Sequence, residues 1–260
     1  MCKVMTSKRN LKETAAAIVI SNLTKKFEDI TAVDELDLKI DRGELFGLLG
    51  PNGAGKTTTI NLLCGLLEPT SGSASVGGHD IQKEANKVKE LIGVCPQATA
   101  VVPYLTGRQN VEHFGNLHTM PKEKLRKNTD NLLERLDLTA DANRRVKSYS
   151  GGMRRRINLI MALVHDPEIA FLDEPTVAMD PQSRLAVWDF IKELKKANKT
   201  VILTTHYMEE AEELCDRVGI IDHGKLIALG SPKQLKRQFS AKNLEEVFIQ
   251  LTGRRIREEP

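Results

Sequence analysis

The spacing of apolar residues along the chain is first strand-like and then helical. Residues 35–40 alternate polar and apolar side chains, which predicts a strand with one face in water. The uninterrupted apolar run Leu45–Leu49 predicts a buried parallel strand, and residues 56–67 predict the helix that follows it. Residues 74–81 predict a hairpin that turns at a Gly-Gly pair. This part of the chain therefore predicts a small antiparallel sheet beside the start of a parallel one.

From residue 107 to residue 164 the apolar repeat becomes helical, with predicted helices over residues 131–138 and 154–164. A later helix is predicted over residues 182–196. Three further buried strands are predicted at residues 169–172, 201–204 and 218–221. Strands that alternate with helices predict an α/β fold with a mainly parallel sheet. A last apolar stripe predicts a C-terminal helix folded onto the core, and it consists of Leu244, Val247, Phe248 and Leu251.

Composition narrows the class of protein without choosing a function. The 260 residues carry a net charge of +3 and only 4% of them are aromatic, so neither a dedicated nucleic-acid binder nor a base-stacking surface is expected. No apolar stretch is long enough to span a bilayer, so any membrane role needs a partner protein. The cysteines are far apart in sequence, which predicts reduced thiols of a cytosolic protein and no zinc site; they are Cys2, Cys64, Cys95 and Cys215.

A glycine-rich segment between the buried strand and its helix matches the pattern GxxxxGK[ST]. Its glycines let the backbone curl so that N–H groups point at a polyphosphate, and the helix adds its positive N-terminal end. Lys56 can bridge the β and γ phosphates, the Thr57 hydroxyl can bind Mg²⁺, and Thr58 can donate to the α phosphate. The alternative is a purely structural turn. The segment reads Gly50, Pro51, Asn52, Gly53, Ala54, Gly55, Lys56 and Thr57.

Two of the later strands end in residues that suit phosphate chemistry. The strand at residues 169–172 leads into Asp173 and Glu174, and the carboxyl ends of parallel strands line the ligand crevice of an open α/β sheet. There Asp173 would hold Mg²⁺, directly or through water, and Glu174 would act as general base on the attacking water. His206 follows the strand at residues 201–204. The alternatives are solvated carboxylates and a structural histidine.

Together these residues resemble the ATP-binding cassette (ABC) family over roughly residues 16–229. Residues 149–153, Tyr-Ser-Gly-Gly-Met, are similar to the family's signature, with Tyr and Met in place of the commoner Leu and Gln. Residues 178–180 resemble its D-loop, and Gln97 and His206 stand at the places of its Q-loop glutamine and its switch histidine.

The resemblance implies the roles of individual residues. Catalysis is implied for Lys56, Gln97, Glu174 and His206. Binding of Mg²⁺ is implied for Thr57, Gln97 and Asp173. Contacts with ATP are implied for residues 50–58, for Phe27 as the aromatic that stacks on adenine, and for Ser150, Gly151, Gly152 and Asp180.

Elementary physics supports the signature as a second phosphate site. Ser150, Gly151 and Gly152 precede the predicted helix at residues 154–164, so a hydroxyl, bare backbone N–H groups and the helix dipole converge on one spot. The alternative is an ordinary helix N-cap. The segment 105–156 carries more basic than acidic side chains, which suits either an anionic membrane or partner surface or a solvated helical face.

The resemblance also implies the architecture. It predicts one domain over residues 1–260, with a P-loop NTPase (RecA-like) core and an antiparallel β subdomain in residues 16–96 and 165–230. A helical subdomain that carries the signature is inserted at residues 97–164, and a helical tail occupies residues 231–260.

The function implied is that of the ATP-hydrolysing subunit of an ABC transporter, dependent on ATP and Mg²⁺. Two copies would pair head to tail around ATP and drive a separate membrane-spanning permease from the cytoplasmic face of the cell membrane. The run at residues 150–156 is similar to the drug-efflux branch of exporters. Nucleic acid is not expected as a partner. Two alternatives stay open, namely a soluble ABC-type ATPase in a non-transport process and a non-hydrolysing nucleotide-dependent scaffold.

Overall fold

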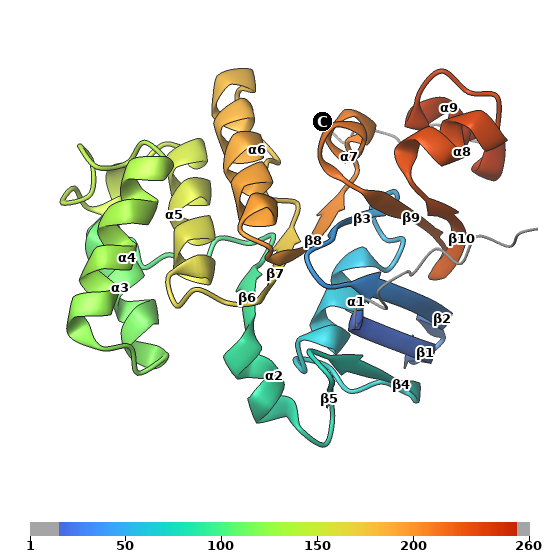
Figure 1. The fold of residues 1–260 in the computed structure, drawn as a ribbon, viewed down its shortest axis with the longest axis horizontal. Coiled ribbons are helices and arrows are strands. Elements are labelled where there is room, and N and C mark those ends of the chain that lie inside the picture. The colour runs from blue at the N-terminus through green and yellow to red at the C-terminus, as the bar shows by residue number, and fades with distance from the viewer. Residues whose placement is uncertain (1–15, 254–260) are drawn as a thin grey trace, which may run out of the picture.

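The structure is a computed structural model and describes residues 16–253. Two sheets and a group of helices are visible in Figure 1. A short 3₁₀ turn occupies Val146–Ser148. In chain order the elements are β1 (Ala16–Phe27), β2 (Ile30–Asp41), β3 (Leu45–Leu49), α1 (Lys56–Leu63), β4 (Ser71–Val76), β5 (His79–Asp80), α2 (Ala85–Leu91), β6 (Ile92–Cys95), α3 (Gly107–Leu117), α4 (Lys122–Arg135), α5 (Gly151–Leu163), β7 (Ile169–Asp173), α6 (Pro181–Lys196), β8 (Thr200–Thr205), α7 (Met208–Leu214), β9 (Arg217–Asp222), β10 (Lys225–Gly230), α8 (Pro232–Gln238) and α9 (Leu244–Thr252).

The larger sheet has six strands in the order β10-β9-β3-β8-β7-β6. Its strands pair in parallel except for β10, which runs antiparallel to β9. The smaller sheet has four antiparallel strands in the order β2-β1-β4-β5. The predicted α/β fold with a mainly parallel sheet and a small antiparallel sheet is therefore confirmed.

Strand β3 lies between two apolar cores because its side chains alternate from one face of the sheet to the other. Phe46 and Leu48 pack into the core formed with α1 and the antiparallel sheet. Leu45 and Leu49 pack into the core formed with α5, α6 and α7. All four are at most 2% exposed. This double burial fixes the carboxyl end of β3, from which the loop at residues 50–55 leaves the sheet.

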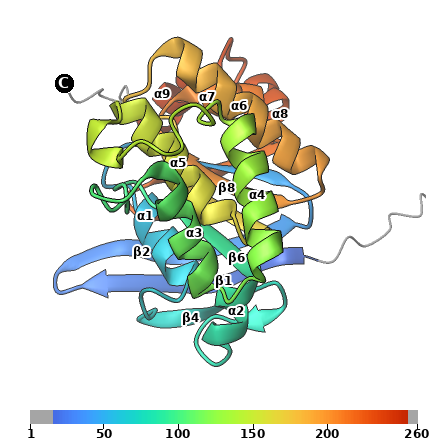
Figure 2. The same cartoon turned by 90° about the vertical axis from the view of Figure 1, so that its left-hand side faces the viewer.

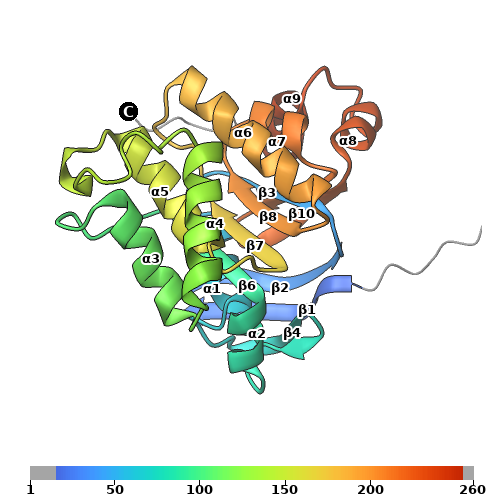
Figure 3. The same ribbon diagram turned by 60° about the vertical axis from the view of Figure 1, so that its left-hand side comes forward.

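Helices α3 to α7 form two groups around the parallel sheet. Helices α3, α4 and α5 stand together at one end of the molecule and are here called the helical subdomain (Figure 2). Helices α6 and α7 run along one side of the parallel sheet, away from the antiparallel sheet (Figure 3). Among residues 16–253 no helix combines the length and apolar character needed to cross a membrane.

Several helices differ in their ends from the sequence-based prediction. The helix predicted over residues 131–138 is the end of the longer helix α4, which begins at Lys122 and ends at Arg135. The helix predicted over residues 56–67 ends at Leu63, because Gly65 turns the chain at φ 67°. The helix predicted over residues 154–164 begins earlier, at Gly151, because the Ser150 side chain caps it.

The predicted apolar stripe of the C-terminal helix is confirmed, since Leu244, Val247 and Phe248 on α9 are fully buried. The described cysteines are buried free thiols, and burial raises the pKa of Cys95 to about 12. Cys2 and the last residues of the predicted tail lie outside the described residues.

Candidate nucleotide-binding site

The loop between β3 and α1 is built around glycines that no other residue can replace without strain. Gly55 immediately precedes α1 at φ 105°, and a Cβ atom there would lie 2.2 Å from the carbonyl oxygen of Ala32. A Cβ atom on Gly50 would lie 2.3 Å from the carbonyl oxygen of Ile221. The chain can therefore turn tightly at the start of α1, where free backbone N–H groups can donate hydrogen bonds to an anion.

Lys56 lies inside this turn and is 5% exposed. Its Nζ donates hydrogen bonds to the carbonyl oxygens of Gly50 (2.8 Å) and Pro51 (3.1 Å) and lies 3.5 Å from Oε1 of Glu174. Burial lowers the pKa of Lys56, and the negative charge of Glu174 opposes this effect. The side chain thus places a cation at the centre of the loop, where the sequence predicted a phosphate contact.

Asp173 ends β7 and meets the start of α1. Its Oδ2 accepts a hydrogen bond from the Thr57 hydroxyl at 2.8 Å, and its Oδ1 accepts one from the Thr204 hydroxyl. Asp173 is 2% exposed. Two of the predicted Mg²⁺ ligands, Thr57 and Asp173, are therefore neighbours.

These oxygen donors fit Mg²⁺, which prefers one or two carboxylates together with phosphate oxygens and water. Within residues 16–253 no three His, Cys, Asp or Glu side chains gather as a metal site. The protein ligands alone would therefore leave most of the coordination sphere of Mg²⁺ to the nucleotide and to water.

The Glu174 carboxylate lies close to three other predicted site residues, and Glu174 is 6% exposed. Its Oε2 accepts a hydrogen bond from Gln97 Nε2 at 3.1 Å, and its Oε1 lies 3.2 Å from His206 Nδ1 and near Lys56. Burial alone would raise the pKa of Glu174, but the His206 hydrogen bond and the Lys56 charge outweigh it, so the pKa lies below its ordinary value. An ionised carboxylate at this place can accept a proton from water.

Half of the predicted site residues line one pocket of about 200 Å³. Asp173 and His206 reach this group through their contacts with Thr57 and Glu174. The lining residues are Ala32, Asn52, Gly53, Ala54, Gly55, Lys56, Thr57, Thr58, Gln97 and Glu174.

The signature and D-loop residues form a second group, outside this pocket. The Ser150 hydroxyl accepts a hydrogen bond from the Met153 N–H at 3.2 Å, and a Cβ atom on Gly152 would lie 3.7 Å from Ser183 Oγ. Asp180 caps α6 by accepting a hydrogen bond from the Ser183 N–H at 2.9 Å. The N-cap alternative for Ser150 therefore holds within one chain. It leaves the Ser150 O–H free to donate to a further acceptor.

Phe27, the predicted adenine-stacking residue, ends β1 and lies outside the phosphate pocket. Its ring is 43% exposed, and Lys25 Nζ lies 5.0 Å from the ring centroid. A flat aromatic surface beside a cation is thus open to solvent at this end of the antiparallel sheet.

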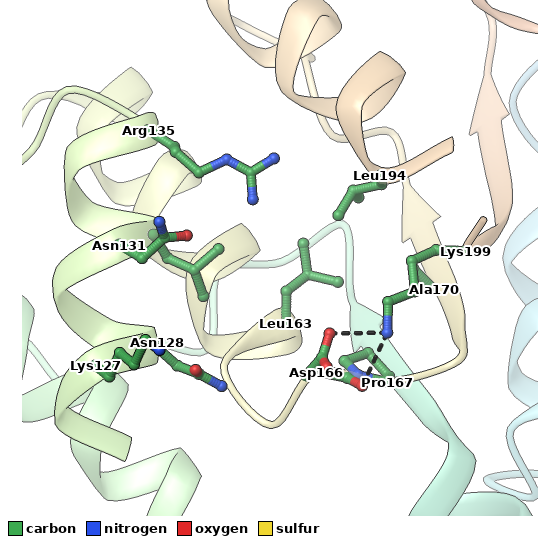
Figure 4. A pocket seen from close by; sticks show the side chains of 11 residues that line it. Lys127, Asn128, Asn131, Arg135, Leu163, Asp166, Pro167, Ala170, Leu194 and Lys199 are labelled. Atoms are coloured by element: carbon green, nitrogen blue, oxygen red, sulfur yellow. Dashed lines mark hydrogen bonds and ion pairs between the residues drawn. The ribbon is translucent and has the colours of Figure 1, made fainter. Parts of the chain in front are cut away.

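A separate cavity of about 290 Å³ lies between the helical subdomain and α6 (Figure 4). Arg135 on α4 and Leu194 on α6 stand on opposite sides of it, and Lys199 forms a 2.8 Å ion pair with Asp166 at its edge. It contains none of the predicted nucleotide-site residues.

Sequence reasoning missed two buried residues that support the site. Thr204 holds Asp173 and also accepts a hydrogen bond from the Glu174 N–H at 3.0 Å. Arg155 on α5 donates to the carbonyl oxygens of Gln97 and Glu174. No sequence pattern singles out Arg155, because it stands in the basic run Arg154–Arg156 and its burial is visible only in the packing of α5.

A phosphate loop at the start of α1, two carboxylates at the end of β7 and a parallel sheet behind them define a P-loop ATPase. The sequence model of the ABC transporter family matches residues 33–177, and the chain belongs to this family. It is an ATP-binding, Mg²⁺-dependent ATPase subunit of that family.

Similar proteins agree with this assignment. The daunorubicin resistance ATP-binding protein DrrA3 of Streptomyces coeruleorubidus is 44% identical over 232 residues, which cover 89% of this chain and 73% of that protein. The linearmycin resistance ATP-binding protein LnrL of Bacillus subtilis is 43% identical over 91% of this chain and 75% of its own length.

Solved structures show the same fold. An ATP-binding subunit of an ABC transporter superimposes with a TM-score of 0.83 at 25% identity, over 91% of this chain and 99% of that one. A dimeric ATP-binding cassette in a post-hydrolysis state with ADP and Pi gives a TM-score of 0.75 at 28% identity, over 82% of this chain and 98% of that one.

Proposed function

We propose that this chain is the ATP-hydrolysing subunit of a drug exporter. Two copies enclose ATP head to tail and drive a separate membrane-spanning subunit, at which the chain sits peripherally on the cytoplasmic face. The observation that carries the proposal is the separation of the two phosphate-binding groups. The group at residues 150–152 does not line the pocket of its own chain, and Gly151 faces open space among the described residues. It is therefore free to face the nucleotide of a second copy.

The first group binds the substrate. Backbone N–H groups of residues 52–58 and the Lys56 ammonium hold the phosphates, and Phe27 stacks on adenine. Thr57, Asp173 and Gln97 would hold Mg²⁺, which supplies positive charge against the charge that develops on the phosphate oxygens. The Ser150 O–H, the Gly151 and Gly152 N–H groups and Asp180 act on the ATP held by the other copy.

Glu174 is the general base of this proposal. Its carboxylate takes a proton as the water oxygen bonds to the γ-phosphorus and the bond to the β,γ-bridging oxygen breaks, which leaves ADP and phosphate. Gln97 and His206 hold this carboxylate by the hydrogen bonds described above. The architecture predicted from the sequence fits this division of labour, with the core holding nucleotide and the helical subdomain presenting the signature.

Two variants test the proposal. Glu174→Gln is expected to bind Mg-ATP normally, to hydrolyse it about 100- to 10,000-fold more slowly, and to elute as an ATP-dependent dimer in size-exclusion chromatography with light scattering. Ser150→Arg is expected to abolish hydrolysis and the dimer while each chain still binds fluorescent ATP. Normal turnover in Glu174→Gln, or a persistent ATP-dependent dimer in Ser150→Arg, would contradict the proposal.

Cell fractionation separates the transport function from the alternative of a soluble ABC-type ATPase. An exporter subunit is expected in the membrane fraction of its host, together with a membrane-spanning protein that copurifies. Recovery from the cytosol alone, without such a partner, would favour the non-transport function.

A further inference from the structure

The inner face of α5 holds the segment that carries Gln97. Arg155 and Asn158 lie three residues apart on this face and are 5% and 2% exposed. Arg155 Nη1 donates to the carbonyl oxygens of Gln97 and of Pro96 (3.4 Å). Asn158 donates to the Pro96 carbonyl at 3.2 Å and accepts from the Ala100 N–H at 3.0 Å. Two side chains of one helix thus fix the backbone on both sides of the Gln97 side chain.

Arg155 makes one contact that Asn158 does not make. Its Nη2 donates a 2.6 Å hydrogen bond to the carbonyl oxygen of Glu174. On the other side of the residue, the Glu174 N–H donates to the hydroxyl (3.0 Å) and the carbonyl (3.1 Å) of Thr204. The backbone of Glu174 is therefore held at both of its polar groups.

This double hold explains an unusual backbone conformation. Glu174 adopts φ 48°, a left-handed conformation that strains any residue with a side chain. Without the bond from Arg155, the Glu174 carbonyl keeps only the longer hydrogen bond from the Val177 N–H (3.3 Å). The backbone of Glu174 is then less firmly held in this conformation, and we expect its carboxylate to shift relative to Gln97 and His206.

The charge on Arg155 adds to the argument. Among residues 16–253 no carboxylate forms an ion pair with its guanidinium, and only backbone carbonyls stabilise it. A buried cation without a counter-ion is costly. Such a residue is an inefficient way to stabilise a fold, so its placement at two functional segments indicates a role in the site.

We infer that Arg155 is a positioning residue that ties the hydrolytic geometry of Glu174 to the position of the signature helix. The inference rests on the general-base role proposed for Glu174. Helix α5 begins at Gly151, and Arg155 lies about 7.5 Å along its axis from Ser150 at 1.5 Å per residue. One rigid helix therefore contacts the other copy's nucleotide at its end and its own chain's Glu174 along its side. A shift of α5 on dimer closure moves the Glu174 carbonyl, so each site responds to the engagement of the other.

The test compares adjacent arginines in the full chain. Arg156 also donates to backbone carbonyls, those of Leu136 (2.7 Å) and Asp137 (3.3 Å), but both lie within the helical subdomain. Arg155→Ala is expected to lower kcat for Mg-ATP about 100-fold, because small displacements of a reacting group cost this much. Its KM and its affinity for fluorescent ATP stay within about threefold of the wild type. Arg156→Ala is expected to lower the melting temperature but to keep kcat within threefold.

A double variant separates positioning from general destabilisation. If Arg155 acts through the Glu174 carboxylate, adding Arg155→Ala to Glu174→Gln slows phosphate release by less than threefold beyond Glu174→Gln alone. Arg155→Lys keeps the charge and part of the bonding, so its kcat is expected between those of Arg155→Ala and the wild type. It carries the comparison if Arg155→Ala does not fold.

The outcomes are distinguishable. Three results would overturn this inference and leave the proposed function intact. The first is an equal loss of kcat in Arg155→Ala and Arg156→Ala, and the second is a loss in the double variant that equals the product of the two single losses. The third is a wild-type kcat in both Arg155→Lys and Arg155→Ala. A wild-type chain that does not hydrolyse Mg-ATP, or a Glu174→Gln variant with normal turnover, would instead overturn the proposed function.

Discussion

Thr204→Val is the substitution whose effect follows most directly from the structure. Valine keeps the shape of the side chain and removes only the hydroxyl, which donates to Asp173 Oδ1 and accepts from the Glu174 N–H. The Glu174 N–H keeps a second acceptor, the Thr204 carbonyl oxygen at 3.1 Å. The hydrogen bond to the Asp173 carboxylate is therefore the principal loss.

The magnitude follows from burial. Thr204 and Asp173 are 0% and 2% exposed, so water cannot replace the lost donor. A hydrogen bond to a charged group contributes about 1.5–3 kcal/mol to the free energy of unfolding. At about 2–4 °C per kcal/mol for a chain of this size, the melting temperature is expected to fall by about 3–12 °C. Asp173 keeps Thr57 as a donor but loses its fixed orientation, so kcat is expected to fall about tenfold or more, as it does when supporting hydrogen bonds of a metal ligand are removed.

Thr200→Val on the same strand is the matched control. Its hydroxyl accepts a 3.0 Å hydrogen bond from the Gly43 N–H, far along β8 from the nucleotide pocket. Scanning calorimetry and phosphate-release assays are expected to show lower stability in both variants and lower kcat in Thr204→Val only. A Thr204→Val variant with an unchanged melting temperature and unchanged kcat would refute the role assigned to this hydroxyl.

Three further outcomes are expected. Gly55→Ala places a side chain at φ 105° and against the Ala32 carbonyl oxygen, so nucleotide binding measured by fluorescence should be lost. Wild-type affinity in this variant would show that the loop does not need its tight backbone conformation to bind nucleotide. Phe27→Ala should weaken ATP binding by about 1 kcal/mol, roughly fivefold in Kd by calorimetry, and an unchanged Kd would remove Phe27 from the site. The lowered pKa of Glu174 stabilises the fold above its ordinary pKa of 4.5. Hence the stability that the Glu174 carboxylate contributes relative to Glu174→Gln, measured as the difference in urea midpoint, should be fully present above about pH 5 and be lost as the pH falls from 4.5 through the lowered pKa. A difference that does not decrease below about pH 4 would contradict the shift.

Segments with one consistent apolar period were predictable from the sequence. Every residue of β3 is buried, and residues 36–40 of β2 are alternately buried and exposed. The pattern of apolar and polar residues in each strand therefore matches its environment. Strand β1 was not predicted. Its pairing with β2 shifts register at several points, and each shift breaks the alternation that would reveal a strand. Helix α7 was missed because acidic residues dominate it, although one of them, Glu210, is buried against Thr176 and Trp188.

Some residues of the candidate site were predictable from the sequence in the same way, and others were not. Residues of the phosphate loop are adjacent in sequence, and Asp173 and Glu174 end a strand, so a local pattern identifies them. Arg155 and Thr204 act through tertiary contacts with segments far away in sequence. The run Arg154–Arg156 looks like a solvated basic surface, and only the packing of α5 shows that its middle residue is buried.

The cavity between α4 and α6 has a consequence for how motion in this protein could be observed. Arg135, which lines this cavity, forms an ion pair with Glu193 on α6, with Nε and Oε2 2.9 Å apart, and both side chains are partly exposed. Such a pair contributes little and weakens in salt. If α5 turns about its buried contacts, this gap changes width, and a spectroscopic label pair on its two walls would register each ATPase cycle without touching either nucleotide-binding surface.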